Sequence, residues 1–275
     1  MPGLRPADGP RGPPLPAPER EEPGLLTPGP AGATSGPDAD RAALRLLSRG
    51  QIEIVGRLAH SSNGTFLVRC RQAGREALAV YKPAAGERPL WDFPEGTLHR
   101  REAAAYEVSR LLGWDLVPPT VPRAEAPLGP GSLQLFVAHD PGQHYFTLLE
   151  RHADAFRRLA LLDAVCNNAD RKSGHCLLDP GGAIRAIDNG LTFHVEPKLR
   201  TVIWDFAGEP IPEADRTAVA GLATALEAGG AGRSRLRRLI SAAELRTLLA
   251  RARRWSEPGV FPEPESSWSF PWPLI

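Results

Sequence analysis

The sequence is poor in cysteine and has no long apolar run. It contains three cysteines, an odd count with no C-x-x-C pair, which excludes a disulfide framework and a four-ligand structural zinc site. This cysteine usage favours a reducing cytoplasm. The first residues show no basic start followed by an apolar run, and no stretch approaches the roughly 18 apolar residues of a membrane span. We therefore expect neither a secretion signal nor a transmembrane segment.

An excess of charge of one sign is missing as well. The chain has 33 lysine and arginine residues against 32 aspartate and glutamate residues, so its formal net charge is +1. This balance argues against a dedicated nucleic-acid-binding protein. Only Lys82, Lys172 and Lys198 are lysines, which makes each of them a candidate for a specific role.

Composition divides the 275 residues into a body and two ends that differ from it. Residues 1–40 contain 11 prolines and 7 glycines, and we interpret this segment as a disordered leader because it lacks backbone donors and apolar mass. Residues 256–275 combine proline with Trp268, Phe270 and Trp272, and so aromatic a tail is expected to dock against its own body. The body is expected to be α+β, with a β-rich lobe at 41–137 and a mainly helical lobe at 138–255.

Hydrophobic spacing and turn residues predict the elements of this body. Strands at 51–58 and 65–70 are expected to form a hairpin around a small-residue turn, followed by a strand at 77–81. A helix is expected at 98–112, with Thr97 as its N-cap and Gly113 at its end. The other expected elements are a strand at 132–137, a helix from a cap at Asp154 to Cys166, a hairpin of 176–178 with 183–187, and helices at 213–228 and 235–255.

Two charged residues that phosphoryl transfer requires occur in the β-rich half. Transfer from a nucleotide needs cations on the phosphates, ligands for a divalent metal and a base near the attacking hydroxyl. Lys82 at a strand end and Glu102 on the following helix would form an ion pair that holds the lysine against the α- and β-phosphates. Taken alone, the pair is better explained by surface charges, a solvated lysine at a strand edge and a glutamate on a helix surface.

The segment 170–175 adds the remaining groups. Asp170 is suited to orient or deprotonate a hydroxyl, and Lys172 could neutralise the γ-phosphate. Asp188, followed by Asn189 and Gly190, could ligate a metal that bridges the β- and γ-phosphates, although Asn-Gly also suits an ordinary turn. The order of these groups along the chain matches a two-lobed protein-kinase-like fold.

The motifs Asn168-Ala169-Asp170-Arg171 and 186–191 (Ala-Ile-Asp-Asn-Gly-Leu) resemble signatures of the phosphatidylinositol 3- and 4-kinase-like superfamily. The segment 81–208 also resembles an uncharacterised actinobacterial branch of it, and HipA-type bacterial protein kinases are similar in layout. The resemblance implies Lys82 on ATP, Asp170 as catalytic aspartate and Asp188 on metal. It further implies a nucleotide turn of Ser61, Ser62, Asn63 and Gly64, and an adenine-contacting hinge of Gln134, Phe136 and Val137. His175 stands where kinases have asparagine, and its imidazole could ligate a metal, although Mg²⁺ prefers oxygen.

These observations predict a kinase that uses ATP with Mg²⁺ or Mn²⁺ and a hydroxyl acceptor that is a lipid, a protein or a small molecule. His175 and the two ends favour one alternative, a nucleotide-binding pseudokinase or regulatory scaffold. A second alternative is adenylyl transfer to a protein. His194, Lys198 and Arg200 are expected either to bind an anionic acceptor or to be solvated. The arginine-rich region 233–254 is expected either to face solvent or to make peripheral contact with an anionic lipid surface.

Overall fold

The computed structural model describes residues 37–58 and 64–275. Most of the expected leader therefore lies outside the described residues, as do Ser61, Ser62 and Asn63. The first described helix, α1 (Pro37–Arg49), begins inside the range expected for the leader. Sequence reasoning missed this helix, which buries the apolar pair Leu46 and Leu47.

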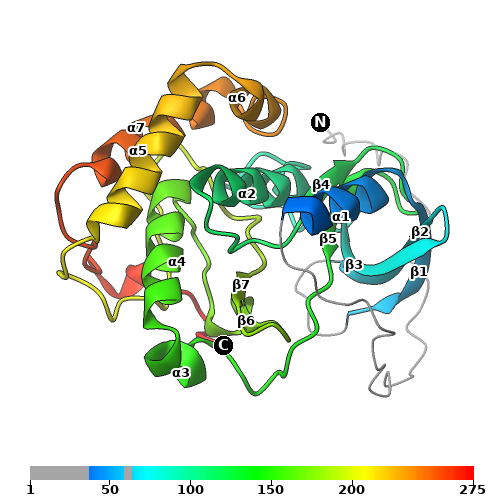
Figure 1. Ribbon diagram of the computed structural model, residues 1–275, viewed down its shortest axis with the longest axis horizontal. Helices are drawn as coiled ribbons and strands as arrows, with labels where there is room; N and C mark the ends of the chain where they lie inside the picture. The colour runs from blue at the N-terminus through cyan, green and yellow to red at the C-terminus, as the bar shows by residue number, and fades with distance from the viewer. Residues whose placement is uncertain (1–36, 59–63) are drawn as a thin grey trace, which may run out of the picture. The chain divides into compact units, whose positions relative to one another are not determined.

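A five-stranded antiparallel sheet forms the first lobe of the described chain (Figure 1). The strands β1 (Gln51–Arg57), β2 (Phe66–Gln72) and β3 (Arg75–Pro83) agree with the sequence prediction. Beyond β3 follow β5 (Gly131–Leu135) and then β4 (Thr120–Arg123), a short strand that was not predicted. Helix α1 packs on this sheet through Leu46 and Leu47, which lie against Val68, Tyr81 and Leu133. The packing buries one face of the sheet.

Helix α2 (Leu98–Leu112) contacts both the sheet and the helices of the second lobe. Its bounds agree with the prediction, and Gly113 ends it in the left-handed conformation at φ 70°. Thr97 is the N-cap residue, as predicted, but its hydroxyl donates to the carbonyl of Pro94 at 2.6 Å and makes no capping bond. The carboxylate of Glu87 accepts the amide hydrogens of Leu98 and His99 at 3.1 and 2.8 Å. A residue from the preceding loop therefore satisfies the free amide groups at this helix start.

Helices make up most of the second lobe, which also contains a small two-stranded hairpin. The predicted single helix at 235–255 is two helices, because Ser241 accepts from the amide of Glu244 and starts a new one. Asp154 lies in the first turn of its helix and is not the cap, which is His152. The elements are α3 (Tyr145–Leu148), α4 (Ala153–Cys166), β6 (Cys176–Leu178), β7 (Ile184–Ala186), α5 (Glu213–Glu227), α6 (Ala231–Leu236) and α7 (Ala242–Ser256). Four 3-10 turns accompany them in the described chain: η1 (Ala84–Gly86), η2 (Leu149–Arg151), η3 (Ser173–His175) and η4 (Ser267–Ser269).

The C-terminal segment after α7 runs along this helical lobe. Phe261 is buried, and its amide donates to the carbonyl of Glu209 at 2.9 Å. Further along, the carbonyl of Ser269 accepts the amide hydrogen of Thr201 at 3.1 Å. Near the end of the chain, the carbonyl of Leu274 accepts the amide hydrogen of Ser173 at 2.8 Å. The last ten residues thus bond to the loop that carries Asp170 and Lys172.

The mixed α+β architecture predicted from the sequence is confirmed. Cys70, Cys166 and Cys176 are buried and unpaired. No helix in the described ranges is both long and apolar enough to cross a membrane.

Candidate functional site

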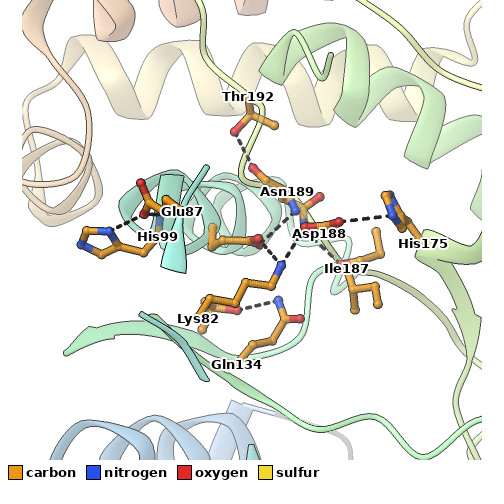
Figure 2. A network of polar contacts seen from close by, with 12 residues as sticks. Lys82, Glu87, His99, Gln134, His175, Ile187, Asp188, Asn189 and Thr192 are labelled. Carbon is orange, nitrogen blue, oxygen red and sulfur yellow. Dashed lines mark hydrogen bonds and ion pairs between the residues drawn. The ribbon is translucent and has the colours of Figure 1, made fainter. Parts of the chain in front are cut away.

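The side chains of Lys82, Glu102 and Asp188 meet between the two lobes (Figure 2). Lys82 comes from the end of β3, Glu102 from the second turn of α2, and Asp188 from the loop after β7. The ammonium group of Lys82 bonds to Glu102 Oε1 and lies 2.8 Å from Asp188 Oδ1. The other oxygen of Glu102 accepts the amide hydrogen of Asn189 at 2.9 Å. The helix therefore fixes both the lysine and the loop that carries the aspartate.

Opposite charges keep Lys82 and Asp188 ionised. Burial lowers the pKa of Lys82, but the carboxylates of Asp188 and Glu102 outweigh it and raise the pKa above its ordinary value. The nearby Lys82 ammonium in turn lowers the pKa of Asp188 well below its usual range. At neutral pH the site thus presents one cation and one carboxylate that is 47% exposed and open to a ligand.

Asp170 and Lys172 lie on the loop that follows α4. Asn167 ends that helix in the left-handed conformation, at φ 56°, and turns the chain toward the cluster. The Lys172 ammonium lies 3.3 Å from Asp170 Oδ2, and the Asp170 side chain is 30% exposed. Burial raises the pKa of Asp170, while Lys172 opposes the shift. A partly exposed carboxylate with a raised pKa can accept a proton from a hydroxyl group.

Arg171 was missed as a site residue, although it lies beside Asp170. Its guanidinium is fully buried and pairs with both carboxylate oxygens of Asp163 at 2.9 and 3.0 Å. It also donates to the carbonyl of Ile187 at 2.7 Å and to Asn189 Oδ1 at 2.6 Å. Arg171 thus connects the Asp170 loop to the residues on either side of Asp188. The one sequence signal was an aspartate inside the apolar face of a helix, since a buried carboxylate requires a partner.

His175 also bonds to Asp188. Its Nε2 lies 3.2 Å from Asp188 Oδ2, and its Nδ1 lies 3.4 Å from the amide nitrogen of Lys172. Burial lowers the pKa of His175 to about 4, so the ring is neutral at pH 7. Because Nδ1 faces an N–H donor, we assign the proton to Nε2, which donates to Asp188. In this tautomer His175 orients the carboxylate and does not offer a lone pair toward it.

The donor set suits a divalent metal held jointly with a nucleotide. No cluster of three or more histidine, cysteine or acidic residues able to hold an ion exists in the part of the chain that the structure describes. Mg²⁺ typically takes one or two carboxylates and completes its shell with phosphate oxygens and water. Asp188, half-exposed at the centre of the cluster, fits this role. His175 fits it less well, because the Nε2 atom that faces Asp188 carries the proton of the neutral ring and has no lone pair to offer.

Of the residues expected around the nucleotide, the structure describes Gly64 and the segment 134–137. The amide of Gly64 donates to the carbonyl of Gly86 at 3.1 Å. A Cβ on Gly86 would lie 2.9 Å from the Gly64 oxygen, so this close approach of the two backbone segments requires glycine at position 86. The Gln134 side chain is buried beside Lys82 and donates to Thr120 Oγ1 at 3.0 Å (Figure 2).

The expected hinge follows Gln134, and the sheet uses part of its backbone. The Phe136 amide donates to the carbonyl of Leu78 at 3.0 Å, so this N–H already has a partner. The Val137 carbonyl lies 2.9 Å from His139 Nδ1.

The segment after Asp188 lies against the Asp170 loop. The Arg171 amide donates to the Arg200 carbonyl at 3.0 Å, and the Arg200 amide donates to the Asn168 carbonyl at 2.8 Å. Lys198 forms an ion pair with Asp92 at 3.0 Å and lies over the exposed ring of Trp91. The expected acceptor-side cation Lys198 is thus tied to the loop before α2. The ring of His194 contacts that of Phe93, with their centroids 5.3 Å apart.

The arrangement defines a kinase-like fold. It is similar to the Golgi casein kinase whose crystal structure has Mn and ADP bound, with a TM-score of 0.51 and 12% identity over 81% of this chain and 75% of that one. The Helicobacter pylori proinflammatory kinase CtkA matches with a TM-score of 0.48 and 10% identity over 78% of this chain and 94% of that one. No protein-family model matches the sequence.

The particular family follows from sequence. The chain belongs to the family of Protein Rv2133c of Mycobacterium tuberculosis, with 41% identity over 265 residues, covering 84% of this chain and 94% of the mycobacterial one. This relative agrees with the actinobacterial branch expected from the motifs. Membership of the phosphatidylinositol 3- and 4-kinase-like superfamily stays a prediction.

Proposed function

We propose that this protein is a phosphotransferase that moves the γ-phosphoryl group of ATP to a hydroxyl group. The observation that carries the proposal is the convergence of Lys82, Glu102 and Asp188 in one cluster, next to the loop of Asp170 and Lys172. Positioned cations, a metal-ligating carboxylate and a base are the parts that phosphoryl transfer requires. Lipid, protein and small-molecule acceptors are all compatible with this site, and the motif resemblance favours a member of the phosphatidylinositol 3- and 4-kinase-like superfamily.

Each residue has a role set by its surroundings. Lys82, held by Glu102, contacts the α- and β-phosphates. Asp170 orients the acceptor hydroxyl and takes its proton as the oxygen bonds to the γ-phosphorus, while the bond from that phosphorus to the β–γ bridging oxygen breaks and ADP leaves. Lys172 neutralises charge on the transferred group. Asp188 would hold Mg²⁺ or Mn²⁺, which when bound neutralises charge on the β- and γ-phosphates.

The expected nucleotide-contacting groups complete the proposal. Ser61, Ser62, Asn63 and Gly64 would cover the phosphates, with Gly86 allowing Gly64 to approach closely. The backbone of Phe136 and Val137 would contact adenine. Since the Phe136 amide is already bonded within the sheet, the Phe136 carbonyl and the Val137 amide are the groups left to do so.

The test is transfer of label from [γ-³²P]ATP, with Mg²⁺ or Mn²⁺, to protein, phosphoinositide and small polyol acceptors. We expect transfer by the wild type and its loss in Asp170→Asn. Asp154→Asn is the matched control, because that carboxylate is 93% exposed on the surface of α4. Transfer that survives in Asp170→Asn would reject the assignment of the base.

A second candidate function is nucleotide binding without turnover, as in a pseudokinase. The specific observation is the His175 ring, which bonds to Asp188 where a metal-ligating oxygen is expected. This candidate predicts that ATP raises the melting temperature while no acceptor is labelled. Label transferred from [α-³²P]ATP instead of [γ-³²P]ATP would indicate adenylyl transfer.

A further inference from the structure

Helices α5, α6 and α7 lie together at one end of the helical lobe (Figure 1). A pocket of about 200 Å³ is lined by residues of these helices and of the turn after α6. None of the groups assigned to phosphoryl transfer lines it. Its lining combines apolar side chains with arginines and contains no acidic residue. The lining residues are Leu226, Arg233, Arg237, Ala242, Leu245, Arg246 and Leu249.

The floor of this pocket is apolar. Leu226 and Leu245 are 1% and 7% exposed and belong to the core of the lobe, and the partly buried Leu249 packs against the same core. A dry cavity of about 150 Å³ is large enough for benzene. The pocket can therefore hold one bulky apolar side chain, but it is smaller than the roughly 300 Å³ at which drug-sized ligand sites begin.

The rim of the pocket carries positive charge that no acidic lining residue neutralises. Arg233 donates to the carbonyls of Leu226 and Glu227 at 2.9 and 3.4 Å, so no carboxylate neutralises it. Arg237 and Arg246 are exposed, and neither guanidinium group has a hydrogen-bond or ion-pair partner within the described ranges. Nearby arginines differ in this respect, because Arg253 pairs with Glu227 at 2.7 Å. The pocket thus attracts anions around an apolar centre.

The rim is also held in position before any ligand arrives. Helix α6 is fixed to α2 by the ion pair of Arg235 with Glu107 at 2.8 Å. Gly232 on α6 lies so close to Leu111 of α2 that a Cβ would come within 2.8 Å of the leucine side chain. Ser241 and Glu244 cap the start of α7. A preformed site binds without the cost of ordering these helices.

We propose that this pocket docks an acidic peptide segment of a partner protein that inserts one bulky apolar side chain between α5, α6 and α7. The apolar floor provides the anchor site, and the arginines around it select acidic flanking residues. A peptide fits better than a bilayer, because the concave, single-side-chain volume has no counterpart in a flat lipid surface.

The test uses fluorescein-labelled nonapeptides with leucine, phenylalanine or tryptophan at the centre and glutamate on either side. Matched peptides carry alanine at the centre or lysine in the flanks. We expect fluorescence anisotropy, measured without nucleotide, to show saturable binding of acidic, anchored peptides that is at least about tenfold tighter than binding of either control. If no anchored acidic peptide exceeds both controls, the proposal is overturned.

Variants locate the binding. Arg237→Glu with Arg246→Glu should weaken binding at least about tenfold. Ala242→Phe fills the pocket with the charges unchanged, and it should also weaken binding. Arg45→Glu with Arg75→Glu changes the charge equally on exposed residues of the sheet lobe and should leave binding unchanged. Equal loss in this control, or binding of phosphatidylserine vesicles that depends on Arg237 and Arg246 without peptide binding, would overturn the proposal.

Discussion

Lys82 and Asp188 are 106 residues apart in the sequence, and their side chains are joined at 2.8 Å, Nζ to Oδ1. The lysine belongs to the sheet lobe and the aspartate to the loop after the hairpin of the helical lobe. Glu102 bonds to the same ammonium group and to the amide of Asn189, so the contact is part of a hydrogen-bond network that joins Lys82, Glu102 and the Asp188 loop. A change in any of these groups should affect the others.

Removal of the Lys82 charge should strongly weaken phosphoryl transfer. We expect Lys82→Met to lower phosphoryl transfer by about 10²–10³-fold, the loss typical for one electrostatic contact to a transition state. Nucleotide affinity, measured by isothermal titration calorimetry, should fall with it. Arg45→Met is the matched control, because that arginine is exposed on α1, away from the cluster. Wild-type transfer by Lys82→Met would contradict the assigned role.

The acid limb of the pH–rate profile should report Asp170. A base must be deprotonated, so activity is lost as pH falls through its pKa, which burial raises above the ordinary aspartate value. Lys172 lowers that pKa, and its removal in Lys172→Gln should therefore move the acid limb of kcat/KM to higher pH. An unchanged limb, or a shift to lower pH, would show that another group titrates there.

Arg171 should determine stability more than any exposed charge in the site. Arg171→Met leaves the Asp163 carboxylate buried without its partner, and loss of one partner of a buried pair costs about 3–5 kcal/mol. We expect urea denaturation to show a loss of that size in the free energy of unfolding. The double change Arg171→Met with Asp163→Leu should recover part of it, since no unpaired charge is left. A double variant as unstable as the sum of the two single ones would contradict this account.

His175→Asn should change the metal response. The amide oxygen of asparagine is a ligand that Mg²⁺ accepts, whereas the imidazole donates its Nε2 proton to Asp188. We expect tighter Mn²⁺ binding by His175→Asn in the presence of ADP, measured by electron paramagnetic resonance, and half-maximal activity at lower Mg²⁺. Weaker metal binding in this variant would instead assign the ring as a ligand.

Removal of residues 266–275 should disturb the catalytic loop. The truncation deletes the carbonyls of Ser269 and Leu274. The first accepts the amide hydrogen of Thr201, in the segment that lies against the Asp170 loop, and the second accepts the amide hydrogen of Ser173, in that loop itself. We expect a lower melting temperature and a lower kcat, with nucleotide affinity close to that of the full chain. Trp272→Ala is the control, because this residue is 87% exposed and its ring should matter little for the melting temperature or kcat. Unchanged kcat after truncation would separate the tail from catalysis.

Local patterns in the sequence were sufficient for much of the fold. The bounds of α2 followed from Thr97 at its start and Gly113 at its end, and the two hairpins followed from their turn residues. Failures occurred where a distant group replaced a local one. Glu87, from a separate loop, accepts the amide hydrogens that Thr97 was expected to cap, and helix α1 is stabilised by packing on a sheet that its own sequence does not reveal.

The sequence by itself determined which chemical groups exist and on which local elements they lie: a lysine at a strand end, a glutamate on a helix, and aspartates after a helix and after a hairpin. Tertiary structure decided which of them meet, because a contact such as that of Lys82 with Asp188 depends on lobe packing and not on spacing along the chain. It also decided that Arg171 is buried and paired while Arg237 is exposed. Burial sets the cost of an unpaired charge, and burial is a property of the assembled fold.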